Sequence, residues 1–501
     1  MELIYFSNRP SEEGPLTLDT VPVEILHHIC TVFCDHCDPM PKPRVKGFET
    51  HNPNKGKKDL LSLCLTSRAV RTVAQPVLFH HFSFGRHLDY DGPVAFQLIA
   101  APFLQALSGK PQLRGAVKQL MINTKKYSST VPGFVSRSKV NQDMAALLPR
   151  LGAKVGIQFH DFELKPGNLQ EAMIQVMIAV CPNLSKLEIR IQRYWAFDKL
   201  AERAPTQSNT NQLRLSSLRT LDARVERFST DNCTFPHEFC AMPAFKSLSE
   251  RALVVASASR LETLKCTLAT LEKAPEMPRL EVLTLDVRGP CSDLKLLFAK
   301  IPNLRELIYY SSNKHGPLPI EINAALRDHR DKLEVLAIHF WRVWLDEIVQ
   351  MDPVIDNTEF RLGLLNDFTN LKVLIVDALR IRDEDKNKSL EEPFQTISDT
   401  IPESLELLCV HDLDEISYPD FRPLFEVADR FREGRFKALK HVLWTREESA
   451  SYPDGLGYLE PGHDSIQSGA YRVGPVRPED VVALKKRYPV IARMLHSCNP
   501  N

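Results

Sequence analysis

Hydrophobic residues near the start of the chain recur with a helical period. Four of them are spaced i, i+4, i+7 and i+8, which places them along one side of an α-helix: Ile25, Ile29, Val32 and Phe33. Leu26 widens this apolar stripe. Pro22 suits the first turn of the helix, because the N–H that proline lacks would have no helical partner there. The pattern therefore predicts one amphipathic helix that begins near residue 22.

Two further helices are predicted after a long polar interval. Asp59 can cap the second helix, which carries Leu60 and Leu63 among its apolar residues. Ser67 can cap a third helix, and we expect that helix to end before Pro76, because proline interrupts helical hydrogen bonding. Three short helices bury little area, so such a module tends to need a partner or a neighbouring domain for stability.

A leucine pattern repeats through the rest of the chain. Nine segments fit, or nearly fit, the string L-x-x-L-x-apolar, and they begin at Leu184, Leu218, Leu261, Leu280, Leu304, Leu333, Leu371, Leu405 and Leu439. Helical patterns stand between some of them, at 171–180 and 294–301 for example. The alternation around Leu283 and Leu285 favours short strands over the structural alternative, an all-α repeat. Helix, turn and strand in repetition predict an irregular α/β solenoid (horseshoe) with its strands on the concave face.

Composition limits the class of function. The chain has 501 residues, too many for one ordinary core, and its 63 basic residues balance 63 acidic ones. This balance argues against a dedicated binder of nucleic acid or of a membrane surface. A run of about 18 apolar residues is missing, and so is a secretory signal. Together with eleven scattered cysteines, these features indicate reduced thiols and a cytoplasmic or nuclear location.

The helical module resembles the F-box of fungal F-box proteins. The string VPVEIL at 21–26 is similar to the F-box opening, DLLSLCLTSR at 59–68 resembles its second half, and AQPVLF at 74–79 is similar to the segment that follows. In that family the F-box binds a Skp adaptor subunit and, through it, a cullin. The resemblance implies six adaptor-binding residues: Pro22, Ile25, Leu26, Ile29, Leu60 and Leu63. The alternative for each of them is packing inside the module's own core.

The repeats resemble degenerate leucine-rich repeats, without the asparagine or cysteine that usually follows the third apolar position. The two resemblances imply a substrate-recognition subunit of a Skp–cullin–F-box ubiquitin ligase, whose repeats bind a protein substrate. The expected domains are a tail at 1–15, an F-box at 16–86 with an inserted loop at 34–58, a repeat domain at 87–445 and a cap or tail at 446–501. The alternative function is a non-catalytic scaffold that binds Skp without cullin, or that acts outside ubiquitination.

The later repeats carry the candidate substrate surface. Counted from the first leucine, the third, fifth and seventh places should face the concave side. In the later copies these places are mostly apolar or aromatic, and exposed aromatic clusters are typical anchors for a protein partner. Tyr310, His339 and Trp341 are therefore the candidate substrate-binding residues. The competing expectation is that residues 446–501, or an insertion loop, fold over this face.

Motifs for catalysis are not evident, and a metal site is not predicted. The strings of metalloproteases, nucleophile elbows, Walker-A loops and dinucleotide sites do not occur, so we expect neither an enzyme nor a cofactor. Cys34 and Cys37 have the C-x-x-C spacing of zinc sites, but such a site needs a second ligand pair. Cys64 is the only later candidate in the module for a further zinc ligand. We therefore interpret Cys30 and the nearby histidines as helix residues.

Overall fold

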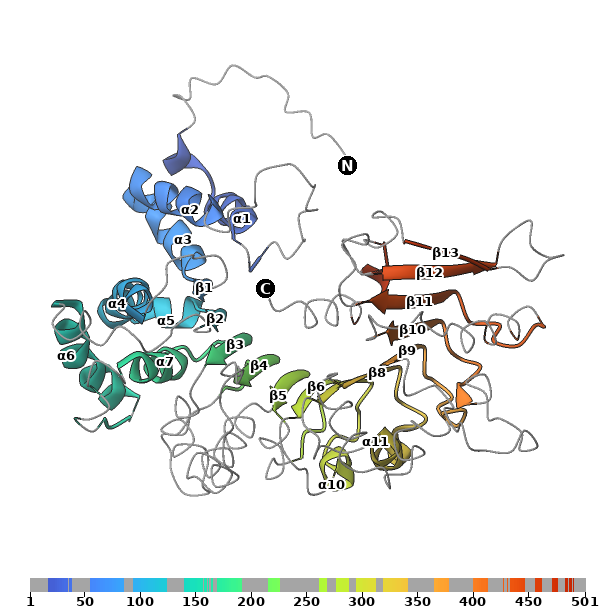
Figure 1. Ribbon diagram of the computed structural model, residues 1–501. Helices are drawn as coiled ribbons and strands as arrows, with labels where there is room; N and C mark the ends of the chain where they lie inside the picture. The colour runs from blue at the N-terminus through green and yellow to red at the C-terminus, as the bar shows by residue number, and fades with distance from the viewer. Residues whose placement is uncertain are drawn as a thin grey trace, which may run out of the picture. The chain divides into compact units, whose positions relative to one another are not determined.

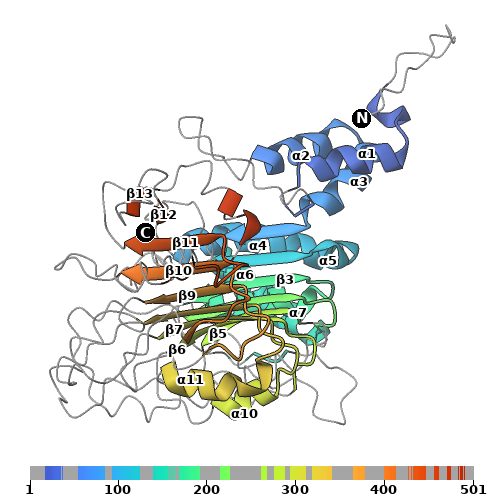
Figure 2. The same ribbon diagram turned by 90° about the vertical axis from the view of Figure 1, so that its right-hand side faces the viewer.

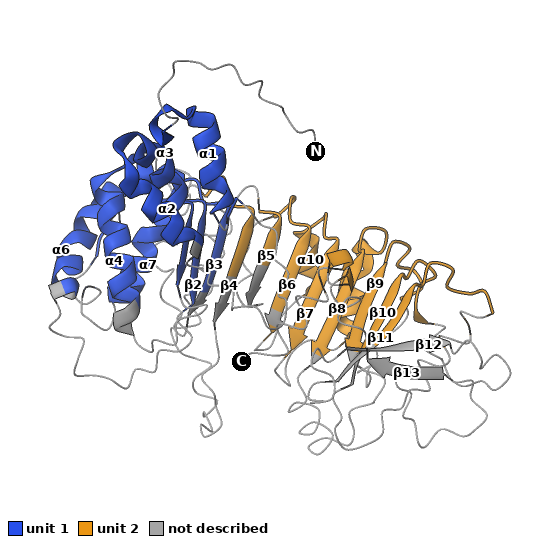
Figure 3. Cartoon of the chain, turned by 90° about the horizontal axis from the view of Figure 1, so that it is seen from above, with its two compact units in different colours: residues 1–189 blue, residues 190–501 orange. Residues whose placement is uncertain are grey.

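The computed structural model of the protein (Figure 1) divides into two compact units, residues 1–189 and 190–501 (Figure 3). It describes residues 17–34, 36–37, 55–84, 93–123, 139–155, 157–159, 161, 164, 169–191, 215–225, 261–267, 276–287, 294–311, 319–340, 365–377, 400–412, 427, 430, 433–446, 456–461, 471–475, 483–484, 486–488 and 490. The first unit combines helices with short strands, and parallel strands dominate the second. Within the described residues, no helix combines the length and the apolar content needed to cross a membrane.

Three helices open the first unit and form what we call the helical module. Helix α1 spans Val23–Val32, α2 spans Lys55–Thr66 and α3 spans Arg68–Leu78, and a short 3-10 helix at Leu18–Thr20 precedes them. Their shared core holds Leu26, Cys30, Cys34, Leu60, Cys64, Val70, Ala74 and Val77. The three predicted helices are therefore present, and together they enclose a small core of their own.

Two helix boundaries differ from the sequence prediction. Helix α2 begins at Lys55, before Asp59, and α3 continues through Pro76 to Leu78. Proline removes only one N–H, and the bonding resumes beyond it, where the Phe79 N–H donates to the Gln75 carbonyl at 3.3 Å. The predicted cap of α3 is confirmed, because the Ser67 hydroxyl accepts the Val70 N–H at 3.1 Å.

The rest of the first unit contains short strands and four described helices. Strands β1 (His81–Phe84), β2 (Gln119–Asn123) and β3 (Lys186–Ile191) are neighbours in chain order, and β1 runs parallel to β2. Helices α4 (Pro93–Gly109), α5 (Gln112–Ala116), α6 (Lys139–Lys154) and α7 (Leu169–Val180) stand between the strands in sequence. The helix predicted at 171–180 is α7, which is buried along most of its length and so belongs to the interior of the unit.

Parallel strands dominate the second unit. They are β4 (Thr220–Val225), β5 (Thr263–Thr267), β6 (Val282–Val287), β7 (Glu306–Ser311), β8 (Val335–Phe340), β9 (Val373–Asp377), β10 (Leu407–Asp412) and β11 (His441–Arg446). Each pairs in parallel with the next along the chain. Strands β12 (Leu456–Pro461) and β13 (Tyr471–Pro475) then continue the order in antiparallel fashion. Helices α10 (Leu294–Ala299) and α11 (Pro319–Ala325) lie together on one side of the strands (Figure 2).

The register of these strands follows the leucine pattern. Each L-x-x-L segment from Leu218 onward runs into a strand, and the second leucine of one copy pairs with that of the next, as Leu307 does with Leu336. Leu307 and Leu336 are fully buried on one face of the strands, and Ile308 and Ala337, which face the other side because alternate residues of a strand do, are fully buried too. The predicted short strands and the mixed α/β class are confirmed, and an all-α repeat is wrong.

Candidate functional site

Helix α1 carries apolar residues on two of its sides. Leu26 and Cys30, one turn apart, are buried in the core of the helical module at 3% and 0% exposure. Ile25 and Val32 belong to a second stripe and are 53% and 55% exposed, with the half-buried Ile29 between them. An apolar stripe that faces solvent is a surface that a partner can cover.

Helix α2 adds to this exposed apolar surface. Among the described residues, ten large apolar side chains are exposed, and six of them fall between residues 18 and 65. These six, which we call the exposed apolar set, are Leu18, Val23, Ile25, Val32, Leu61 and Leu65. Leu61 and Leu65 stand four residues apart on α2, so they share one side of that helix. The concentration of exposed apolar groups distinguishes the helical module from the rest of the described chain.

The six residues matched to adaptor-binding positions divide by burial. Pro22 and Ile25 are exposed, and Ile29 and Leu63 are half-buried. Leu26 and Leu60 are only 3% and 1% exposed, so their side chains serve the core of the folded module. Of the exposed apolar set, sequence reasoning named only Ile25 as adaptor-binding and left out the other five members: Leu18, Val23, Val32, Leu61 and Leu65. Helical periodicity marks the apolar positions, but it does not say which of two stripes faces inward.

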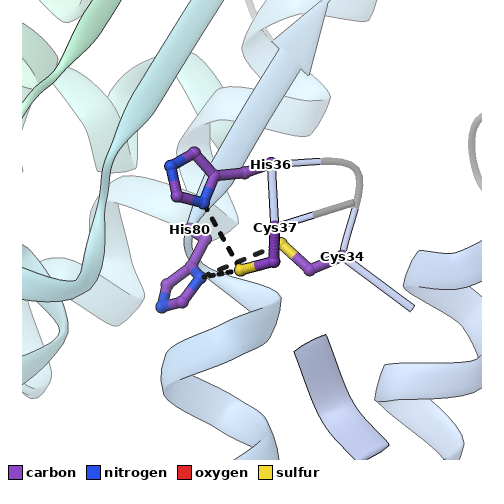
Figure 4. Close-up of side chains that lie close together, drawn as sticks. All are labelled: Cys34, His36, Cys37 and His80. Atoms are coloured by element: carbon purple, nitrogen blue, oxygen red, sulfur yellow. Dashed lines mark hydrogen bonds between the residues drawn. The ribbon is translucent and has the colours of Figure 1, made fainter. Parts of the chain in front are cut away.

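Four side chains with metal-binding atoms converge where α1 ends (Figure 4). Cys34 follows α1, His36 and Cys37 belong to the next turn, and His80 lies between α3 and β1. Their ligand atoms all lie within 4.8 Å of one another. The Cys37 sulfur is 3.5 Å from His36 Nδ1 and 3.3 Å from His80 Nδ1, and the Cys34 sulfur is 3.8 Å from His80 Nδ1.

This cluster bears on the interpretation of the cysteines. Cys30 is a helix residue of α1, as interpreted, whereas His36 and His80 could supply the second ligand pair that the sequence analysis required. Cys64 lies outside the cluster. His80 was overlooked because 43 positions separate it from Cys37 in sequence. The only signal for it in the sequence is its place just after the third predicted helix. This histidine reaches the cysteines only if the chain brings the end of the third helix back to the end of the first.

Burial controls the charge of the cluster. It lowers the pKa of His80 to about 4, and the nearby His36 and Lys118 lower that pKa as well. Burial also lowers the pKa of His36, and it raises the pKa of Cys37 to about 12 with a contribution from Cys34. Both imidazoles are therefore neutral at pH 7, and a neutral imidazole keeps the lone pair that a metal ion or a thiol hydrogen requires.

The candidate substrate-binding residues lie on a covered face. Tyr310 and His339 are 6% and 2% exposed, and their rings meet edge to face at 6.1 Å. One face of β7–β11 forms an apolar cluster that includes Tyr310, and three residues from the C-terminal part of the chain close it: Leu484, Tyr488 and Val490. The sequence analysis left open whether this patch is free or covered by residues 446–501. At its described positions the patch is buried, and apolar strand surface is more stable when covered. Trp341 lies outside the described residues.

Polar contacts hold the covering residues in place. One carboxylate oxygen of Glu406 accepts hydrogen bonds from the Tyr488 hydroxyl at 3.3 Å, from Arg487 at 3.2 Å and from Lys440 at 2.7 Å. The hydrogen bond from Lys440 contributes most to lowering the pKa of Glu406, and that from Arg487 acts in the same direction, while burial opposes both. The Tyr488 ring meets His441 of β11 edge to face at 6.0 Å.

Comparisons with known proteins leave the function to be argued from these residues. No protein-family model matches the chain, and no curated protein matches it. The features available for that argument are the exposed apolar set, the cysteine–histidine cluster and the covered face of β7–β11.

Proposed function

We propose that this chain is the substrate-recognition subunit of a Skp–cullin–F-box ubiquitin ligase, in which helices α1 and α2 bind the Skp adaptor. The observation that carries the proposal is the exposed apolar set, because six of the ten exposed large apolar side chains among the described residues belong to this one helical module and the 3-10 helix before it. The strings at 21–26 and 59–68, which resemble the F-box, contain four members of the set.

Energetics favour a protein partner for this module. Covering one exposed valine, leucine or isoleucine contributes about 1.5–3 kcal/mol. Association costs at least about 4 kcal/mol in lost translational and rotational freedom, so several such side chains must be buried together. The exposed apolar set supplies several from α1 and α2, two helices that share one small core, as helix-in-groove recognition requires.

The parallel strands of the second unit serve as the substrate-binding part in this proposal. Their apolar face on β7–β11 is covered by Leu484, Tyr488 and Val490. A substrate therefore uses that face only when these residues move away. Chemistry on the substrate belongs to other subunits, so this chain positions the substrate without reacting with it.

A double substitution in the exposed apolar set tests the adaptor interface. The change Ile25→Asp with Leu61→Asp places charge on exposed positions of α1 and α2, and we expect it to weaken capture of purified Skp adaptor at least about tenfold. The matched control is His27→Asp with Ser62→Asp, which adds the same charge to exposed neighbouring positions of the same helices. We expect this control to bind like the unmodified chain. Circular dichroism should show equal helix content in all three proteins.

The outcome of the capture experiment separates the candidate functions. When purified cullin is supplied together with Skp, recovery of both with the unmodified chain supports the ligase subunit. Recovery of Skp without cullin overturns that role and favours the scaffold. If the unmodified chain captures no Skp, or if the double variant captures as much as the control, the assigned interface is wrong.

A further inference from the structure

We propose that Cys34, His36, Cys37 and His80 form a structural zinc site. This inference is independent of the proposed function, since it rests on the geometry and chemistry of four side chains at the end of α1. The four ligand atoms are two sulfurs and two imidazole nitrogens, all within 4.8 Å of one another (Figure 4). Two cysteines with two histidines are one of the standard ligand sets of tetrahedral structural zinc.

The distances fit a tetrahedral ion. Zinc–sulfur bonds of about 2.3 Å and zinc–nitrogen bonds of about 2.0 Å place the sulfur and nitrogen ligands of one tetrahedral ion about 3.5 Å apart. The corresponding distances are 3.5 Å from Cys37 to His36, 3.3 Å from Cys37 to His80 and 3.8 Å from Cys34 to His80. Shifts of a few tenths of an ångström would bring these three pairs to ideal values. Three of the six donor pairs are therefore close to the spacing that the ion requires, and the other three lie within 4.8 Å.

The local backbone brings the ligands together. The chain turns directly after α1, where the Cys37 N–H donates to the Cys34 carbonyl at 3.0 Å, and this turn aims both sulfurs at one point. Both histidines present Nδ1 to the Cys37 sulfur. His80 comes from the turn after α3, where its own N–H donates to the Val77 carbonyl at 3.1 Å. Two helix ends therefore fix the four ligands, and neither depends on a long flexible side chain.

Charge balance also favours zinc. On binding, the two thiols each release one proton, and the resulting two thiolates neutralise the Zn²⁺ while the imidazoles stay neutral. The product has no net charge, which suits a site with one buried and three half-buried ligands. A disulfide between Cys34 and Cys37 would occupy the sulfurs but leave two imidazoles without a role. Cys30 and Cys64 share the apolar core with Cys34 but lie outside the cluster of four.

Such a site would join the helical module to the strands of its unit. Cys34, His36 and Cys37 follow α1, and His80 directly precedes β1. The bound ion would close a loop of 43 positions between Cys37 and His80 and so oppose separation of α1 from the start of β1. Four protein ligands fill the coordination of a tetrahedral zinc ion, which gives the site a role in stability.

Metal content of the full chain tests the site directly. The chain is purified under reducing conditions without chelators, and zinc is measured by elemental mass spectrometry, with about one ion per chain expected. We expect Cys37→Ser and His80→Asn each to lower this content at least about tenfold. The matched controls Cys64→Ser and His28→Asn replace the same residue types outside the cluster and should keep the ion. Cobalt titration of the unmodified chain should give the visible bands of tetrahedral cobalt and the ultraviolet band of cobalt–thiolate bonding.

Several results would overturn the site. They are an unmodified chain without zinc and without tetrahedral cobalt absorption, a Cys34–Cys37 disulfide found by mass spectrometry in the reduced preparation, and equal metal content in cluster and control variants. The cobalt titration uses the unmodified chain, so it decides the question even where a variant fails to fold. Because none of these measurements involves Skp, failure of the zinc site and failure of the adaptor interface are seen separately.

Discussion

Ile25 and Leu26 are neighbours on α1 with opposite environments. Leu26 is 3% exposed in the core of the helical module, whereas Ile25 is 53% exposed. We predict that Leu26→Ala lowers the free energy of unfolding by about 2–5 kcal/mol, because it removes buried methyl groups and leaves a cavity. Ile25→Ala should change it by no more than about 0.5 kcal/mol, as exposed substitutions do. Urea unfolding followed by circular dichroism measures both values, and equal losses would contradict the assignment of the two stripes.

Residue-scale prediction from the sequence succeeded where a pattern was local. The spacing of Ile25, Ile29 and Val32 predicted a helix that is present, and Ser67 was correctly assigned as a cap. The orientation of that helix could not be predicted, because α1 is apolar on two sides and only its neighbours decide which side is buried. His80 was missed for a related reason: its distance from Cys37 is short in space and long in sequence.

At the scale of elements, the residue just before the first leucine of a repeat copy connects that copy to the preceding segment by a side-chain hydrogen bond. The Asn303 side chain donates to the Pro278 carbonyl at 2.7 Å, Asn183 does the same to Gly115 at 2.9 Å, and Ser404 to Leu371 at 2.9 Å. Asn370 likewise donates to the Asp331 carbonyl. Leucine-rich repeats usually carry an asparagine after the third apolar position, and this chain lacks it. Polar side chains just before the first leucine instead form hydrogen bonds to backbone carbonyls of the preceding segment.

Removing one of these contacts should have a modest cost. We predict that Asn303→Ala lowers the free energy of unfolding by about 1 kcal/mol, because it deletes one side-chain hydrogen bond to the backbone at an exposed position. Arg279→Ala, at the equivalent exposed position of the preceding copy, is the control and should have little effect. Thermal unfolding of the two variants compares them, and a loss as large for Arg279→Ala would show that alanine itself causes the change.

The backbone repeats in step with these side chains. The carbonyl of the residue after the first leucine of a copy accepts two N–H groups from the next copy. The Arg305 carbonyl, for example, accepts the Glu334 N–H at 2.7 Å and the Val335 N–H at 3.0 Å. The same arrangement recurs from Glu334 to Lys372 and from Lys372 to Glu406. The leucine spacing therefore predicts the position of each strand. It also predicts the parallel register, because the accepting carbonyl occupies the same place in these copies of the repeat. The intervals between copies vary too much for the sequence to fix the helices that connect them.

At the scale of the whole molecule, the covered face of β7–β11 joins distant parts of the second unit. Leu484, Tyr488 and Val490 pack against strands that precede them in the chain, and Glu406, directly before β10, binds Tyr488 and Arg487. The sequence left open whether this face is free or covered. The covering residues carry no repeat pattern of their own, so only their contacts identify them.

Acid should loosen this cover. The hydrogen bond from Lys440 and that from Arg487 hold the pKa of Glu406 below its ordinary value. Its contribution to stability is therefore complete above the unfolded carboxyl pKa, about 4.3, and is lost as the pH falls through the lower folded value. We predict that hydrogen-exchange protection of residues 484–490, relative to an unstructured peptide at the same pH, falls across that range.

Two variants check the origin of this pH dependence. Glu406→Gln should lower the protection of residues 484–490 at neutral pH and remove its dependence on acid, because the amide keeps the shape but not the charge. Glu403→Gln changes an exposed carboxyl of the same segment and should behave like the unmodified chain. A pH profile that is unchanged in Glu406→Gln would assign the acid effect to another group.

The cover also has a consequence for how the protein is made. A ribosome synthesises β7 to β11 before it reaches Leu484, Tyr488 and Val490, so the apolar face of these strands emerges before the residues that shield it. During that interval the nascent chain presents Ile308, Val373 and Ile375 to solvent, and such surfaces promote aggregation and attract chaperones. A premature stop codon between β11 and residue 484 would remove the covering residues and leave this apolar face exposed permanently. A small loss of sequence would then cause a large loss of solubility.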